Sequence, residues 1–147
     1  MALTIRSLDV SNTAPALALY NELTLGPETS DAGAFEQVLA HPGTTVFGAE
    51  VDSSIQAMVT LHLLPNVTWN ARPYGLVENV VTSKRYRGQG LGRAVLEAAI
   101  DAAWRAGAYK VMLLTGQKRG AKGFYESVGF SGEDKHAMVI RRTWRTS

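Results

Sequence analysis

The stretch Tyr86–Gly92, YRGQGLG, most limits the folds that this sequence can adopt. Glycine alternates there with larger residues, between the valine-rich run 74–83 and an apolar helical pattern that starts at Gly90. A strand, a glycine-rich turn and a helix in this order predict an α/β fold. Free N–H groups and the helix dipole favour an anion at such a helix start, and glycine lets the backbone approach it. We expect an anionic ligand here, with a plain strand-to-helix connection as the alternative.

The helical pattern from Gly90 to Ala106 is the clearest in the chain. Its charged residues recur every four positions and form one polar stripe, made of Arg93, Glu97, Asp101 and Arg105. The remaining faces carry Leu, Val, Ile, Ala and Trp. We therefore expect a mostly buried helix that ends before Gly107.

The other periodic segments are shorter, and they alternate between strand and helix patterns. Strands are expected at 3–10, 44–51, 55–64, 74–83, 109–114 and 136–144. Helices are expected from Ser11 or Asn12 to Leu23, from Ser30 or Asp31 to Leu39, and over 120–128. The short spacer after residue 51 predicts a hairpin. No repeat, linker or low-complexity tract interrupts the sequence, so we expect one α/β domain over residues 1–147.

Composition excludes several kinds of site and partner. The chain has no cysteine, so it has no disulfide, thiolate metal site or cysteine nucleophile. Its 3 histidines lack metal-ligand spacing, so we expect no metal. No basic run is interleaved with aromatic residues, so we expect no nucleic-acid partner. Without a leader pattern or an apolar run of ~20 residues, we expect a cytoplasmic protein with no membrane partner.

The glycine spacing limits which phosphate ligand is expected. A P-loop requires G-x-x-x-x-G-K-[ST], which is absent, and a dinucleotide fingerprint requires G-x-G-x-x-G. Gly88, Gly90 and Gly92 give G-x-G-x-G instead. The strand expected next, 109–114, also lacks the acidic residue that would bind a ribose hydroxyl.

Two motifs in register resemble those of the GCN5-related N-acetyltransferases. Arg87-x-x-Gly90-x-Gly92 is similar to the family's acyl-CoA loop, and residues 123–130, GFYESVGF, resemble its FYxxxGF segment. The order of the expected elements also resembles the family's order over nearly the whole chain. Within the family, ENVV, YRGQGLG and FYESVGF look most like the glucosamine-phosphate N-acetyltransferase branch. The resemblance implies a mixed, mostly antiparallel sheet flanked by helices.

The resemblance also implies acetyl-CoA as the acetyl donor. Backbone amides of the glycine loop would hold its pyrophosphate, from Arg87, Gly88, Gln89, Gly90, Leu91, Gly92 and Arg93. The pantetheine arm would pair, like a strand, with the backbone of Val80, Val81 and Thr82.

Acetyl transfer to an amine requires a base, a donor for the thioester oxygen and an acid for the departing thiolate. Glu78 is the candidate base, acting directly or through water, and we expect it to share a strand face with Val80 and Thr82. The alternative is a structural carboxylate, or one that only binds the substrate ammonium. The resemblance makes Tyr125 the candidate acid, and a packing tyrosine is its alternative. A backbone N–H near Val80 is the candidate oxyanion donor.

The acceptor is expected to be a small primary amine, with an amino-sugar phosphate first among the candidates. Lys110 and Arg141 are the residues expected to meet a phosphate. Asn79 stands where the amino-sugar-phosphate branch usually carries aspartate, and the polar loop 65–75 is a candidate wall of the pocket. The alternatives are a protein or peptide amine, and a non-catalytic CoA sensor. The resemblance also allows a homodimer through the segment 136–144.

Overall fold

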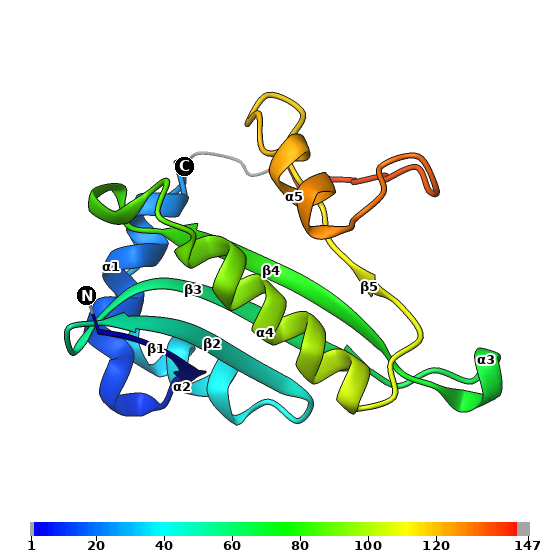
Figure 1. The fold of residues 1–147 in the computed structure, drawn as a ribbon, viewed down its shortest axis with the longest axis horizontal. Helices are drawn as coiled ribbons and strands as arrows, with labels where there is room; N and C mark the ends of the chain where they lie inside the picture. Colours follow the sequence, from blue (N-terminus) through cyan, green and yellow to red (C-terminus); the bar gives the residue numbers. More distant parts are fainter. Residues whose placement is uncertain (1, 144–147) are drawn as a thin grey trace. The chain divides into compact units, whose positions relative to one another are not determined.

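The computed structural model describes residues 2–143 (Figure 1). Its strands are β1 (Leu3–Ser7), β2 (Thr44–Val51), β3 (Ser54–Leu64), β4 (Tyr74–Thr82) and β5 (Val111–Met112). Its α-helices are α1 (Thr13–Leu23), α2 (Ala32–Ala40), α3 (Thr68–Ala71), α4 (Leu91–Arg105) and α5 (Lys122–Val128). Short 3₁₀ turns are η1 (Val10–Asn12) and η2 (Lys84–Tyr86). The described chain forms two compact units, one within residues 1–113 and one within 114–147.

The first unit is built on a 5-stranded sheet in the order β1-β2-β3-β4-β5. The first four strands pair antiparallel, and β5 pairs parallel with β4. Helices α1 and α2 cover one face of this sheet, and α4 covers the other (Figure 1). The mixed, mostly antiparallel sheet flanked by helices confirms the expected fold class.

Strand β3 is buried on both faces because helices cover both sides of the sheet. Met58 belongs to the core cluster on the α1–α2 side, with Phe35 of α2 and Val81 of β4. Leu61 lies on the opposite face, where it approaches Gly75 beside Ala103 of α4. This double covering explains the nearly continuous apolar sequence of β3.

The hairpin and the start of the second helix agree with the sequence analysis. The turn between β2 and β3 places Asp52 and Ser53 at positive φ, as tight hairpins require. The Asp31 carboxylate caps α2 by accepting from the Ala34 N–H at 3.1 Å.

Two expected strands differ from the structure. The run 109–114 forms strand only at Val111–Met112, because only Gly75 and Leu76 of β4 pair with it. The expected closing strand is absent from residues 136–143, which are exposed. Its alternating pattern finds no pairing edge, and an unpaired strand gains no ladder hydrogen bonds. Residue 144, which the expected strand included, lies outside the described residues.

Candidate active site

The glycine loop 86–92 joins η2 to the start of α4. Its base is fixed by Ser83, whose N–H donates to the Gln56 carbonyl and whose hydroxyl bonds the Gln56 side chain, both at 2.8 Å. Gly88 and Gly90 have φ of +78° and +83°, a region that glycine adopts without strain. Nothing lies within 4 Å of where a Cβ would stand at either residue, so the loop opens onto free space.

The N-terminus of α4 presents backbone donors that have no partner. The Ala94 N–H donates to the Gly90 carbonyl at 3.1 Å and is the first of the helix to bond in this way. Within residues 2–143, the N–H groups of residues 88–93 have no hydrogen-bond acceptor. Leu91 is fully buried and fixes the first turn in the core. Such a turn binds an anion through its N–H groups and its dipole.

Arg87 of the loop and Arg93 of α4 are already engaged. The Arg87 Nε donates to the Thr82 carbonyl at 3.2 Å, which holds the side chain against the end of β4. Its terminal nitrogens remain as further donors. Arg93 forms an ion pair with Glu97 at 2.7 Å on the exposed side of α4. The negative charge of Glu97 therefore weakens the attraction of Arg93 for an approaching anion.

A β-bulge interrupts β4 next to the candidate base. Thr60 of β3 pairs with Glu78 and Met58 pairs with Val81, so Asn79 and Val80 oppose Val59 alone. Asn79 takes the left-handed conformation, with φ of +53°. A bulge leaves its extra residue unpaired and bends the strand.

The bulge corrects the expected face of Glu78. In a regular strand, Glu78, Val80 and Thr82 would share a face, which was the prediction. Thr82 instead pairs with Ala57, on the α4 face with Leu61, whereas Glu78 pairs with Thr60 on the α1–α2 face. The prediction was wrong because the extra residue reverses the alternation between Glu78 and Thr82.

The Glu78 side chain is half-buried, and it has no hydrogen-bond or ion-pair partner within residues 2–143. The carboxylate lies on the face of the sheet that α1 and α2 cover. It is therefore available to a ligand on that face.

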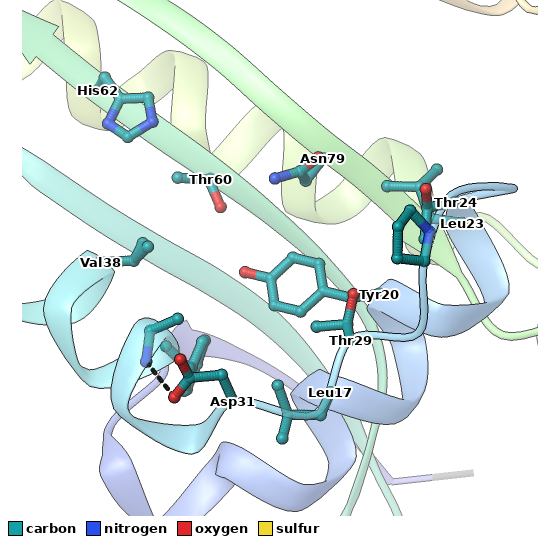
Figure 2. Close-up of a pocket in the computed structure, with 13 residues that line it drawn as sticks. Leu17, Tyr20, Leu23, Thr24, Thr29, Asp31, Val38, Thr60, His62 and Asn79 are labelled. Atoms are coloured by element: carbon teal, nitrogen blue, oxygen red, sulfur yellow. Dashed lines mark hydrogen bonds between the residues drawn. The ribbon is translucent and has the colours of Figure 1, made fainter. Parts of the chain in front are cut away.

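A cavity of about 330 Å³ lies between this face of the sheet and the two helices (Figure 2). We call it the α1–α2 cavity. Its lining residues come from both helices, the segment between them, β3 and β4: Leu17, Tyr20, Leu23, Thr24, Pro27, Thr29, Asp31, Ala34, Phe35, Val38, Thr60, His62 and Asn79. Asn79, an expected substrate residue, is thus in its wall.

Polar groups converge within this cavity, as Figure 2 shows. The Tyr20 hydroxyl points toward Thr60. Burial raises the pKa of Tyr20 above its ordinary value, and the Thr60 side chain opposes that rise. The sequence analysis missed Tyr20, Thr60 and His62 as site residues. For Thr60 and His62, the available signal was a polar residue at positions of β3 whose neighbours are apolar. Tyr20 of α1 gave no such signal.

The outer edge of β4 is open beside the cavity. Strand β5 pairs with β4 only at Gly75 and Leu76 and then diverges from it. Among the described residues, no strand pairs with the outer edge of β4 at Val80–Thr82. An edge of this kind accepts an extended ligand that carries amides.

Tyr125 lies in the second unit, on α5. Its ring packs edge-to-face on Phe124 and Phe130, with centroids 5.1 and 6.1 Å away. Burial raises the pKa of Tyr125, and the positive charge of Arg119 lowers it by a smaller amount. The phenol therefore keeps its proton at neutral pH.

Lys110, one of the two expected phosphate contacts, is not among the residues that line the α1–α2 cavity. Lys110 is half-buried, and its Nζ stands 5.5 Å from the Tyr74 ring centroid and 5.3 Å from that of Tyr109. Arg141 is exposed in the second unit. Loop 65–75 does not contribute to the cavity lining either, since Trp69 stacks on Tyr109 at 5.3 Å.

The described residues contain neither a cluster that could hold a metal ion nor a helix that could cross a bilayer. No group of three or more His, Asp or Glu side chains could hold a metal ion among residues 2–143. None of the helices in that range is long and apolar enough to cross a bilayer.

Comparisons with known proteins identify the family of this chain. Residues 10–130 match the Acetyltransferase (GNAT) family. The glucosamine 6-phosphate N-acetyltransferase of Trypanosoma brucei brucei is 30% identical over 141 residues, which cover 93% of this chain and 95% of that protein. The enzyme of the same name from Arabidopsis thaliana is 28% identical over 136 residues, or 88% and 90% of the two chains.

A solved structure extends the likeness to the whole fold. It is a protein of Agrobacterium tumefaciens str. C58 that is provisionally called an acetyltransferase, 40% identical to this chain, with a TM-score of 0.89. The match covers 95% of this chain and 99% of that one. The chain therefore belongs to the GNAT family and is an acetyl-CoA-dependent N-acetyltransferase.

Proposed function

We propose that this enzyme acetylates a small primary amine bound in the α1–α2 cavity, with an amino-sugar phosphate as the first candidate. The position of the cavity carries the proposal. Asn79 in its wall belongs to the β4 bulge, next to Glu78 and to the open edge of β4. An acceptor in the cavity and a thioester along that edge would meet at the bulge.

The residues present fit acetyl-CoA as the acetyl donor. The unpartnered N–H groups of residues 88–93 and the terminal nitrogens of Arg87 would bind the pyrophosphate. The open edge at Val80, Val81 and Thr82 would pair with the amides of the pantetheine arm. Since the Thr82 carbonyl already accepts from Arg87, Val80 and Val81 carry most of that pairing.

Glu78 acts on the acceptor amine in this proposal. An ammonium cannot attack a thioester until it loses a proton, and a nearby carboxylate both attracts the cation and accepts protons. The new C–N bond forms as the C–S bond breaks. One nitrogen proton leaves to solvent and a second ends on the CoA thiol. A backbone N–H near Val80 would stabilise the charge that develops on the thioester oxygen.

Tyr125 is the proposed acid for the departing thiolate. The phenol carries its proton at working pH, as a proton donor must. The FYxxxGF motif is the basis for assigning the tyrosine to the reaction.

The amino-sugar phosphate is proposed from the relatives' names and from the charges of this chain. Both curated relatives are called glucosamine 6-phosphate N-acetyltransferase. Among the described lining residues, Asp31 is the carboxylate and none is Lys or Arg, so the phosphate is proposed to extend beyond the cavity lining. Lys110 and Arg141 are proposed to bind the phosphate, and Asn79 a sugar hydroxyl.

A panel of amines tests this proposal by following release of free thiol from acetyl-CoA. The panel contains glucosamine 6-phosphate, glucosamine, spermidine and a peptide with a free N-terminus. We expect the highest kcat/KM with glucosamine 6-phosphate. A preference for glucosamine would remove the phosphate from the proposal, and turnover of the peptide alone would support the rival protein N-acetyltransferase. Binding of acetyl-CoA without any turnover would support the sensor.

We also propose that two copies associate through the segment 136–143. It contains Met138, Val139 and Ile140, which are exposed in the single chain. Multi-angle light scattering should give the mass of a dimer for the intact chain, and a monomer would contradict this proposal.

A further inference from the structure

A chain of hydrogen bonds leads from the α1–α2 cavity to the surface. The His62 Nδ1 lies 2.8 Å from the Thr44 hydroxyl, which lies 3.0 Å from the Nδ1 of His41. The two imidazole rings stand edge-to-face, with centroids 6.4 Å apart. His62 lines the cavity (Figure 2), whereas His41 is exposed.

The backbone holds this chain in place. Thr44 and His62 are directly paired across β2 and β3. The turn that carries His41 is closed by the Thr44 N–H, which donates to the His41 carbonyl at 3.1 Å. Position 43 in that turn has no space for a side chain, because a Cβ there would lie 2.6 Å from the Leu63 carbonyl oxygen. The arrangement is therefore fixed by the sheet register and by a glycine.

Because Thr44 has one hydroxyl proton, donation runs in one direction along this series of hydrogen bonds. Thr44 donates to one Nδ1 and accepts from the other. When Thr44 donates to a neutral His41, His62 carries its proton on Nδ1 and leaves Nε2 as a free base. Within residues 2–143, Nε2 of His62 has no hydrogen-bond partner.

We propose that His62 is a further catalytic residue, which takes the proton of the acceptor amine at Nε2, and that Thr44 and His41 are positioning residues. The inference rests on the proposed place of the amine in the α1–α2 cavity. The N–H bond of the ammonium breaks, a new N–H bond forms at Nε2, and the amine keeps the lone pair that attacks the thioester. His62 later returns the proton to solvent.

The division of labour with Glu78 follows from their chemistry. An imidazole is a stronger base than a carboxylate, so it is closer in strength to an amine and transfers the proton more efficiently. Glu78 pairs with Thr60 and His62 pairs with Leu76, so the two side chains are diagonal neighbours on one face. Glu78 then takes its alternative role and only holds the ammonium by charge, while His62 replaces it as the base that removes the proton.

Other titratable groups also face His62 and enter its pH dependence. Tyr20 of α1 and Asp31 at the start of α2 line the same cavity, His41 lies at the end of α2, and Glu78 lies on β4. Protonation of His41 removes the acceptor for the Thr44 proton and adds a like charge beside His62. We therefore expect activity to fall steeply on the acid side.

A matched pair of variants at Thr44 tests the inference, since Thr44 is not among the residues lining the cavity. Thr44→Val keeps the shape and removes the hydroxyl, whereas Thr44→Ser keeps the hydroxyl. We expect Thr44→Val to lower kcat about tenfold near neutral pH and leave the KM of the amine unchanged, and Thr44→Ser to retain the wild-type kcat. The deficit should shrink as pH approaches the pKa of the free amine, because the amine then arrives unprotonated. His62→Gln should lower kcat by about 10²-fold with the same pH trend.

Two controls separate the possible failures. Ala34 lines the cavity and is exposed, so the larger side chain in Ala34→Leu should narrow the cavity and raise the KM of the amine. If it does not, the cavity is not the acceptor site and the proposed function fails. If it does, and Thr44→Val matches Thr44→Ser in kcat at every pH, only the present inference is overturned. ¹⁵N NMR of the histidine rings tests the tautomer without substrate, and a neutral His62 protonated on Nε2 would also overturn it.

Discussion

Asn79 is the residue that most changes how the site is understood. Its left-handed φ marks the bulge that leaves Glu78 on the α1–α2 face of the sheet and Thr82 on the α4 face. The sequence analysis predicted a regular strand, because nothing in the sequence of residues 74–83 reveals that one residue is left out of the pairing with β3. The identity of Glu78 as the candidate base was open to sequence reasoning, but its direction was not.

Gly90 should be required for its backbone conformation. Gly90→Ala should lower the free energy of unfolding by about 1 kcal/mol, because an L-residue is strained at φ of +83° and no atom nearby adds a clash. Urea denaturation followed by circular dichroism measures this change. The control Gly92→Ala places the same methyl inside α4, where alanine has the higher helix propensity, and should not destabilise. Equal effects of the two substitutions would contradict the explanation.

Tyr125→Phe should separate binding from chemistry. The substitution keeps the ring contacts with Phe124 and Phe130 and removes the hydroxyl. We expect kcat to fall by about 10²-fold and acetyl-CoA binding to stay unchanged. Stopped-flow thiol release together with calorimetry distinguishes the two quantities. An unchanged kcat would leave Tyr125 as a packing residue.

Tyr20 should make the fold sensitive to alkali. Burial raises the pKa of Tyr20 in the folded chain, so the folded state holds the phenolic proton more tightly than the unfolded state does. Its contribution is therefore fully present below the ordinary pKa near ~10 and is lost as pH rises through the folded value. Thermal melts between neutral and strongly alkaline pH should show a smaller loss for Tyr20→Phe than for wild type. Parallel losses in the two proteins would refute this assignment.

At the scale of elements, sequence periodicity predicted correctly the elements whose formation depends on local sequence alone. Helix α4 was predicted because its polar stripe and capping glycines lie within its own sequence. Strand β5 and the segment 136–143 were over-predicted, because a strand pattern does not reveal whether a partner edge exists. The α1–α2 cavity escaped prediction for a related reason. Tyr20, Thr60 and His62 come from different elements, and only tertiary packing brings them together.

Deleting Asn79 tests the bulge as an element. Without it, Val80 would pair with Val59 and β4 would run as a regular strand. The protein should fold with its sheet intact, since Met58 and Val81 keep their register. We expect kcat to drop by about 10²-fold or more, because the backbone and Glu78 would no longer keep their relative positions. Far-ultraviolet circular dichroism checks the fold and the thiol assay checks activity. Full activity would show that the bulge has no catalytic role.

At the scale of the whole molecule, the two sides of the reaction rest on different parts of the first unit. In the proposed function, the glycine loop, the start of α4 and the open edge of β4 form the donor side, and α1, α2 and β3 form the acceptor side. The proposed donor side could be predicted from the motif, because the proposed phosphate contacts are made by the backbone. The proposed acceptor side depends on side chains, and Asn79 stands where the branch that the sequence resembles usually carries aspartate.

The most direct test of the account is the binding of acetyl-CoA, compared with acetyl-pantetheine, by isothermal titration calorimetry. The pantetheine compound lacks the pyrophosphate but retains the thioester and the arm. We predict saturable binding of acetyl-CoA, with acetyl-pantetheine binding at least about tenfold more weakly, and a similar weakening of acetyl-CoA binding in Gly90→Ala. Equal affinity for the two compounds, or wild-type affinity in Gly90→Ala, would contradict the claim that YRGQGLG holds the CoA pyrophosphate.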